Sequence, residues 1–339
     1  MLTMGTLIPS AMFAGNEDRI GTAGATQLLI NPWARSSALA NSNVASVTGI
    51  ESAFMNVAGL AFTRKSELMF TNTNWMKGSD ISINAIGLAQ RVGESSVIGL
   101  SIMSVDFGDL VTSTENVPEG DGSTFSVNNL NIGLSFAKEF SNSIYGGMTV
   151  RMISESIFNA KASGVAFDAG IKYVSGERDQ IKFGITLKNV GPPISFSGDG
   201  FSFQTTLDNG TIITAEQRSA SHEIPSLIQI GASYDFILAD NHDLTANAAF
   251  VSNAFSRDNF NLGLQYSFKN MFILRGGYQF ESTSGESTSN NTTFLTGLAA
   301  GVSVQAPIGK AGGAIGFDYT YRDTSPFDGV HSVGVRIDI

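Results

Sequence analysis

Residues able to carry out chemistry are few in this sequence, and their spacing matches no catalytic or metal-binding pattern. The chain has no cysteine and three histidines, His222, His242 and His331. No serine or acid stands at a recognisable spacing from them, and the sequence contains no Gly-x-Ser-x-Gly, no phosphate-binding loop and no metal-ligand pair. We therefore expect no catalytic residue, no metal and no cofactor, in a protein that is not an enzyme.

One segment carries enough acids to raise the question of calcium. Residues 108–124 contain four carboxylates, Asp109, Glu115, Glu119 and Asp121. Their spacing matches no known calcium loop, so a solvated acidic surface is the favoured interpretation.

The composition of the chain limits which partners it can bind and which secondary structure could cross a membrane. The 339 residues are 42% apolar and 15% charged, with 37 glycines and 24 phenylalanines. The net charge of -10 argues against a nucleic-acid partner, because the 20 Lys and Arg are scattered singly. No window approaches the run of about 18 apolar residues that a spanning helix needs. If the chain crosses a membrane, it must do so with strands.

From about Ser66 onward the sequence alternates with period two, the pattern of strands with one apolar face. In residues 260–268, FNLGLQYSF, every other residue is apolar or aromatic and Asn, Gly, Gln and Ser stand between. About 14 such segments follow one another: 66–76, 80–91, 95–107, 125–140, 144–158, 162–174, 180–190, 224–238, 242–252, 259–268, 271–282, 293–306, 310–322 and 328–339. Most reach ten residues, which matches a tilted bilayer span and exceeds the usual ~5 to 6 residues of a soluble strand.

The connections between these segments differ at the two ends. Short turns such as 91–95, 140–144 and 269–270 alternate with mostly longer, Gly-, Ser-, Asn- and Asp-rich loops such as 108–124 and 191–223. Outer-membrane barrels have this asymmetry, with tight turns in the periplasm and loops outside the cell. The sequence therefore predicts an all-β membrane protein, an antiparallel outer-membrane barrel of about 14 strands formed by residues 66–339.

The last segment supports closure of that barrel. Val333, Val335, Ile337 and Ile339 alternate with Gly334, Arg336 and Asp338 up to the carboxyl terminus. We expect this strand to pair with the first one. Arg336 and Asp338 should face the lumen, because a lipid-facing Arg costs ~2 to 4 kcal/mol at mid-depth.

The first 65 residues follow a different pattern. Residues 1–14 are apolar and uncharged before Gly15, which is typical of the end of a signal peptide; an ordinary apolar strand or helix is the alternative. Residues 15–65 read as short helix-like and loop-like pieces. Because they include Leu28, Trp33 and Phe54, we expect them to pack inside the barrel as a plug.

Within residues 15–65 the motifs become specific. The stretch 30–40, INPWARSSALA, contains Asn31, Pro32 and Arg35, and the stretch 56–61, NVAGLA, contains Asn56 and Gly59. Together with KNVGPPI at 188–194, these stretches resemble the PorV/PorQ family of Bacteroidota outer-membrane proteins, most closely PorV. Val57 stands where that family usually has Pro.

The resemblance implies a fold similar to FadL fatty-acid transporters, with a lumenal plug, and a location in the bacterial outer membrane. It also implies a role in type IX secretion. PorV-like barrels bind secreted cargo through its C-terminal signal domain and pass it from the translocon to the attachment complex, whereas PorQ-like members hold a surface partner protein. The implied partners are secreted cargo proteins, translocon or attachment-complex proteins and outer-membrane lipid.

The longest loop is the expected partner-binding site. In 191–223 the segment around Asp208-Asn209-Gly210 predicts a hairpin, whose edge could accept a partner's strand. The residues expected to contact the partner are Phe196, Phe201, Phe203, Leu207 and Ile212. Two other interpretations stay open: a lid with its Phe residues turned inward, and a FadL-like transporter of hydrophobic small molecules. The expected lumen face, rich in Gly, Ser, Thr, Asn and Gln, fits a hydrated interior better than a lipid path.

Overall fold

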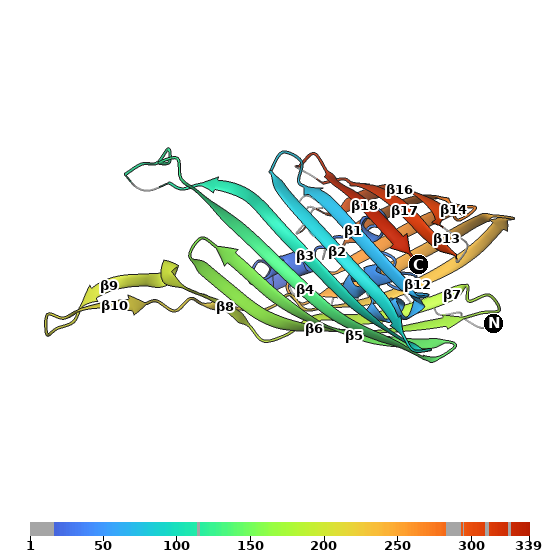
Figure 1. The fold of residues 1–339 in the computed structure, drawn as a ribbon, viewed down its shortest axis with the longest axis horizontal. Helices are drawn as coiled ribbons and strands as arrows, with labels where there is room; N and C mark the ends of the chain where they lie inside the picture. Colours follow the sequence, from blue (N-terminus) through green and yellow to red (C-terminus); the bar gives the residue numbers. More distant parts are fainter. Residues whose placement is uncertain (1–16, 114–115, 283–292, 294, 309–311, 325–326) are drawn as a thin grey trace, which may run out of the picture.

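Antiparallel strands of the computed structural model close into a barrel (Figure 1). The structure describes residues 17–339 except 114–115, 283–292, 294, 309–311 and 325–326. The expected signal-peptide remnant, residues 1–14, and Glu115 lie outside the described residues. No helix in the described part of the chain is long and apolar enough to cross a membrane.

Fourteen strands form the barrel, which confirms the predicted fold class. They are β1 (Ser66–Trp75), β2 (Ile81–Val92), β3 (Ser96–Val111), β4 (Thr124–Ser141), β5 (Ile144–Ile157), β6 (Ala160–Ser175), β7 (Ile181–Val190), β12 (Leu227–Ala239), β13 (His242–Asn253), β14 (Asn259–Phe268), β15 (Phe272–Glu281), β16 (Gly297–Ile308), β17 (Gly313–Arg322) and β18 (Val330–Asp338). The clearest differences from the sequence-based segments are β3, which continues to Val111, and β16, which begins at Gly297.

Closure follows the expected pattern, in which the last strand pairs with the first. β18 pairs antiparallel with β1 from Glu67↔Asp338 to Asn74↔His331. Every other barrel strand pairs with its neighbours in the chain, and β7 pairs with β12 across the longest loop. Arg336 faces the lumen, where its guanidinium donates to Gln305 and lies 3.5 Å from Asp338.

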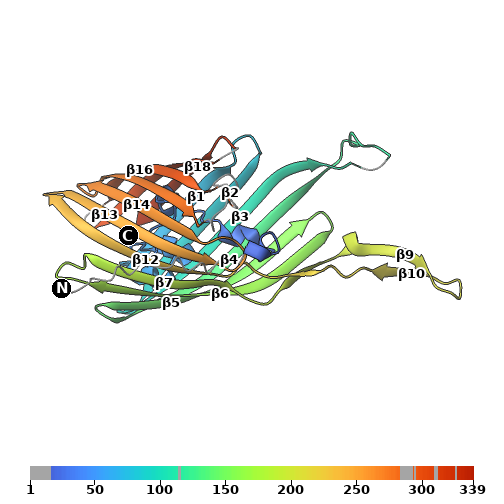
Figure 2. The same cartoon turned by 180° about the vertical axis from the view of Figure 1, so that it is seen from behind.

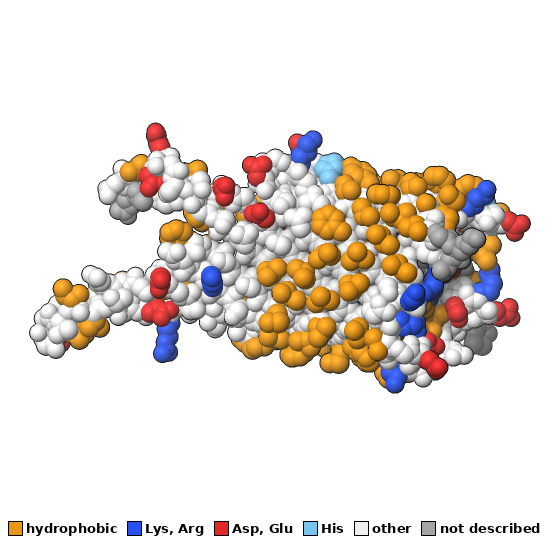
Figure 3. Space-filling model, in the orientation of Figure 1, with side chains coloured by type: hydrophobic (Ala, Val, Ile, Leu, Met, Phe, Trp, Pro, Cys, Tyr) orange, Lys and Arg blue, Asp and Glu red, His pale blue; other side chains and the backbone are white. Residues whose placement is uncertain are grey.

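The two faces of the wall match a barrel that has lipid outside and polar groups inside. Outward residues such as Leu134, Leu264 and Phe317 are more than half exposed. On the face seen in Figure 3, apolar side chains form a band over the half of the molecule away from the long projections. Inward residues such as Arg151 and Lys172 are buried. Lipid supplies the apolar surroundings that a soluble core would otherwise provide.

The barrel has a turn end and a loop end of unequal build. At the turn end, β4 and β5 are joined by residues 142–143 and β14 and β15 by residues 269–271. At the loop end, strands β3 to β6 continue past the apolar band, and their outward residues become polar, including Ser126, Asn128 and Ser154. One side of the barrel therefore stands above the membrane as a wall (Figures 1 and 3).

The N-terminal segment lies within the ring of strands (Figures 1 and 2). Its short helices are η1 (Glu17–Arg19), η2 (Thr26–Leu29), α1 (Ala34–Ala38), η3 (Ile50–Phe54) and η4 (Val57–Phe62). Trp33, Ile50 and Leu60 share a buried cluster with Met69 of β1 and Val97 of β3.

Inward glycines make room for this segment. A Cβ atom on Gly277 would lie 2.3 Å from the Leu39 carbonyl carbon, and one on Gly184 would lie 2.7 Å from the Val44 carbonyl oxygen. These distances are too short for any side chain, so the glycines allow backbone to pack on backbone. That the segment closes the lumen to solutes stays a prediction.

Candidate functional site

The longest connection, residues 191–226, is anchored at its base by a buried polar chain. Asn189, the residue before the end of β7, has a φ of 59°, in the left-handed region that Asn tolerates. Its backbone N–H donates to Asp168 at 2.7 Å and its side-chain amide donates to the Pro225 carbonyl at 3.1 Å. Asp168 in turn pairs with Arg151 at 2.8 Å. The Lys-Asn-Val-Gly-Pro-Pro motif thus fixes both ends of the loop.

Beyond this base the loop extends the barrel wall. The short strand β8 (Ile194–Ser197) pairs with β6 through Ala162↔Phe196, and β11 (Ser221–His222) pairs with β8. Next to β11, the Gly24 N–H donates to the Glu223 carbonyl at 2.9 Å. Phe196 packs against a buried cluster that joins the loop to the N-terminal segment, formed by Ala25, Leu28, Ile153, Ala162, Ala166, Ile194 and Ile224.

The distal part of the loop is the predicted hairpin. β9 (Ser202–Thr206) and β10 (Ile212–Glu216) pair from Thr206↔Ile212 to Ser202↔Glu216, and Gly210 in the turn has a φ of 82°. The hairpin projects from the loop end of the barrel instead of folding over its mouth (Figures 1 and 2), so the lid interpretation is wrong.

The five predicted contact residues divide into two groups. Phe196 and Phe201 lie at the base and are partly buried. Phe203, Leu207 and Ile212 lie on the hairpin and are 50%, 45% and 68% exposed. The second group presents apolar surface to solvent, whereas Phe196 packs at the base of the loop.

A second apolar surface at the loop end was missed by the sequence reasoning. Leu110 of β3 is cross-strand from Phe125 of β4, whose ring lies 5.9 Å from that of Phe158 in the β5–β6 turn. Phe158 is 61% exposed and Ile157, at the end of β5, is 41% exposed. These four residues, Leu110, Phe125, Ile157 and Phe158, form what we call the apolar rim at the top of the wall. The available signal was apolar residues at strand ends whose outward neighbours are already Ser or Asn.

The surface of the other long loop is acidic. Asp106, Asp109, Glu119 and Asp121 are exposed, and Figure 3 shows acidic side chains on this projection. Asp121 accepts from the Ser123 hydroxyl and N–H at 2.6 and 2.9 Å, and these hydrogen bonds hold its pKa below the usual range. The described residues contain no group of three or more His, Asp or Glu able to hold a metal ion.

The motif residues of the N-terminal segment hold its own backbone in place. The Asn31 side chain accepts from the Trp33 N–H at 3.0 Å, directly across Pro32. Asn56 accepts from the Ala58 N–H at 3.2 Å and donates to Ile171 of the wall at 3.0 Å. A Cβ on Gly59 would lie 2.3 Å from the Val47 carbonyl oxygen. These contacts hold the backbone of the segment against itself and against the wall.

Arg35 is the motif residue that carries charge into the lumen. Its Nε lies 3.6 Å from Glu51, whose other oxygen accepts from the Ser36 N–H at 2.6 Å. Burial is the largest single effect on the pKa of the Arg35 guanidinium and lowers it, but four surrounding carboxylates, Glu51 first, together raise the pKa above its ordinary value. Glu51 is the carboxylate that forms an ion pair with Arg35.

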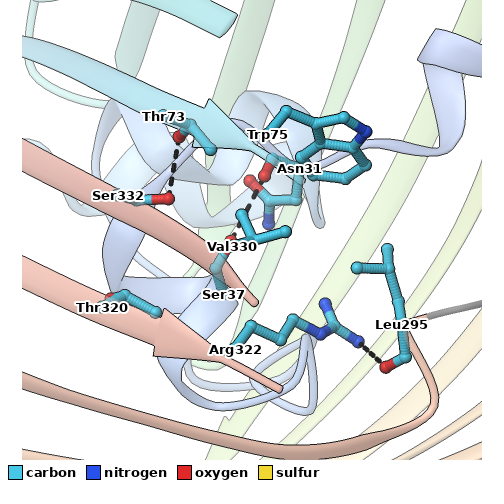
Figure 4. A pocket seen from close by; sticks show the side chains of 9 residues that line it. All are labelled: Asn31, Ser37, Thr73, Trp75, Leu295, Thr320, Arg322, Val330 and Ser332. Carbon is cyan, nitrogen blue, oxygen red and sulfur yellow. Dashed lines mark hydrogen bonds between the residues drawn. The ribbon is translucent and has the colours of Figure 1, made fainter. Parts of the chain in front are cut away.

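Polar contacts such as Arg151 to the Ala53 carbonyl and Thr320 to the Ala34 carbonyl occupy part of the space between the segment and the wall. Figure 4 shows a pocket of only about 10 Å³, in which Arg322 donates to the Leu295 carbonyl and Thr73 bonds Ser332. A larger cavity of about 210 Å³ is lined by polar groups that include Arg35, Lys182 and Arg275. Neither cavity provides an apolar path along which a hydrophobic molecule could cross the lumen.

The fold is similar to that of a hydrocarbon channel, a toluene transporter and a FadL homologue of known structure. A monoaromatic hydrocarbon channel, CymD, aligns at 13% identity and a TM-score of 0.55 over 96% of this chain and 97% of that chain. The toluene transporter TodX of Pseudomonas putida aligns at 11% identity and a TM-score of 0.56 over 91% of this chain and 97% of that chain. A FadL homologue of Pseudomonas aeruginosa aligns at 12% identity and a TM-score of 0.51 over 97% of this chain and 99% of that chain. At these identities the likeness shows the fold alone, that of a FadL-like β-barrel.

Sequence gives the family within that class. The family model for the type IX secretion system protein PorV matches residues 13–254, which is most of the chain. The chain belongs to the PorV family, as the motifs at 30–40, 56–61 and 188–194 predicted. No curated protein sequence matches it.

Proposed function

We propose that this barrel binds secreted proteins at its loop end and passes cargo, through its C-terminal signal domain, from the translocon to the surface attachment machinery. The observation that carries the proposal is the projecting hairpin, on which Phe203, Leu207 and Ile212 are exposed to water. Exposed apolar groups above a membrane band mark an interaction surface. Membership of the PorV family supports the secretion context.

The hairpin offers two kinds of contact. Because β9 and β10 form a separate two-stranded sheet, each has an edge without a strand partner in the described structure. A β-domain of the cargo can add a strand to such an edge, and its side chains can pack on Phe203 or Ile212. A contact of this size is modest, which suits a carrier that must release its cargo. The apolar rim supplies further surface at the same end.

Transport of hydrophobic small molecules is the alternative that the fold raises, because two similar structures are named as a hydrocarbon channel and a toluene transporter. Such a path would need continuous apolar lining. The lumen instead holds the buried side chains of Arg151, Lys172 and Arg275 among the described residues. A PorQ-like anchor would use the same loop end but would keep its partner instead of releasing it.

The test is to replace residues 199–218 by a tight turn. The barrel should still fold, because β7 and β12 pair directly and Asn189 still reaches Pro225. Cargo capture and secretion should fall. A matched control is Gln204→Ala with Thr214→Ala, a cross-strand pair on the same hairpin that leaves the apolar side chains in place.

Two outcomes would contradict the proposal. If the shortened protein captures cargo as well as the parent, the contact lies elsewhere. If a hydrophobic compound stops entering cells while cargo traffic is unchanged, the transporter interpretation takes its place.

A further inference from the structure

The lipid-facing surface has an apolar groove at the turn end of β4 to β7. The groove has a volume of about 590 Å³. Its walls are the side chains of Phe136, Phe140, Met148, Ile171, Ile185 and Leu187. All six are between 41% and 67% exposed, so no described part of the chain covers them.

The groove exists because small residues stand back to back in the wall. Gly146 and Ala169 face outward and form the floor. Their neighbours Gly147 and Gly170 face inward and are cross-strand partners. A Cβ on Gly170 would lie 2.2 Å from the Asn56 side-chain oxygen, so the inner face is shaped to receive the N-terminal segment. The wall is therefore thin here, and its outer side is hollow.

One cation borders this groove. Lys138 points to the lipid side of β4, directly cross-strand from Gly146. It lies three residues before the end of β4 at Ser141, about 10 Å along the strand. Among the described residues it has no ion pair and no side-chain hydrogen bond. A lipid-facing lysine is tolerated near the interface, where its amine can reach a headgroup.

We propose that this groove binds an acyl chain of a glycerophospholipid whose phosphate pairs with Lys138. Charge complementarity favours this occupant, because an apolar cleft with a single ammonium group at its edge matches a hydrocarbon chain joined to an anion. The position of the groove near the turn end also favours a phospholipid. Tight turns of such barrels face the periplasm, and the periplasmic leaflet consists of phospholipid. The lipid would cover the thin wall opposite Asn56 and be held more firmly than its neighbours.

The experiment measures lipid retained by the purified full-length barrel. The protein is extracted in mild detergent, washed, and its bound phospholipid is quantified per barrel. Gly146→Leu should fill the groove without crowding backbone, since the nearest atom to a Cβ there is the ring of Phe140. Displacing even two methylene groups should lower retention about tenfold. Lys138→Gln should lower the preference for phosphatidylglycerol over phosphatidylcholine in nanodiscs about fivefold, the effect of one lysine beside an anionic headgroup.

The matched control is Ala300→Leu, an exposed position on β16 that does not line the groove. It should retain lipid like the parent. Heat-dependent migration in gels confirms that each variant is a folded barrel. Equal retention by Gly146→Leu and Ala300→Leu overturns the proposal. So does retained lipopolysaccharide in place of phospholipid, which would put the groove in the other leaflet, or a dimer of the parent that Gly146→Leu dissociates.

Discussion

Arg151 on β5 and Asp168 on β6 form an ion pair of 2.8 Å inside the barrel wall. The same guanidinium donates to the Ala53 carbonyl at 3.0 Å and lies over the Phe54 ring at 4.4 Å. Asp168 also accepts from Asn189 at the base of the long loop. The pair therefore joins the N-terminal segment to the loop that carries the hairpin.

Removing one partner of this pair should destabilise the protein strongly. Asp168→Ala leaves the Arg151 guanidinium buried without its carboxylate, which costs about 3 to 5 kcal/mol. The measurement is urea unfolding of the refolded barrel in lipid vesicles. Asp235→Ala serves as the control, because its pair with Lys182 is partly exposed and should be worth about 1 kcal/mol or less. If both variants lose the same free energy of unfolding, the Arg151–Asp168 pair has no special role in stability.

Adjacent glycines on β15 allow a test of the N-terminal segment. Gly277→Ala should push the segment away from the wall, because the new Cβ would meet Leu39 at 2.3 Å. Gly276→Ala should have little effect, because its nearest contact is at 4.0 Å. Limited proteolysis should then cut within residues 17–63 of the Gly277→Ala protein only. Ready removal of this segment from the parent would contradict its packing as a plug.

The two ends of the barrel can be assigned by labelling, since the chain has no cysteine of its own. Single cysteines at Ser123 and Asn209 should react with a membrane-impermeant maleimide on intact cells. A cysteine at Asn270, in a turn between β14 and β15, should react only after lysis. Labelling of Asn270 on intact cells would reverse the orientation.

The strands were predictable because each carries its own signal. Alternation with period two needs no information from elsewhere in the chain, and residues 259–268 form β14 as expected. The contacts across the lumen were not predictable. Arg151 and Ala53 are 98 residues apart, and Lys172 and Val47, joined at 3.1 Å, are 125 apart. No local pattern indicates which inward side chain meets which carbonyl.

The candidate site was predictable only where a local sequence signal marks it. The Asn209-Gly210 turn signals the hairpin locally. The projection of the hairpin depends on how β8 and β11 continue the wall. β8 pairs with β6 through two residue pairs, and β11 pairs with β8 through two more. The apolar rim depends on how far β3 to β6 rise, and a bulge between Asp106 and Asp109 lets β3 continue beyond its expected end.

Direct titration of the purified barrel with the purified C-terminal signal domain of a secreted protein tests the central claim. Phe203→Ser with Ile212→Ser should weaken binding about 30-fold or more, because truncating two apolar anchors at about 1 to 2 kcal/mol each costs about 2 to 4 kcal/mol together. Gln204→Ala with Thr214→Ala should bind like the parent. Unchanged affinity in the Phe203→Ser, Ile212→Ser protein, with the barrel folded, would contradict the account of cargo capture by this hairpin.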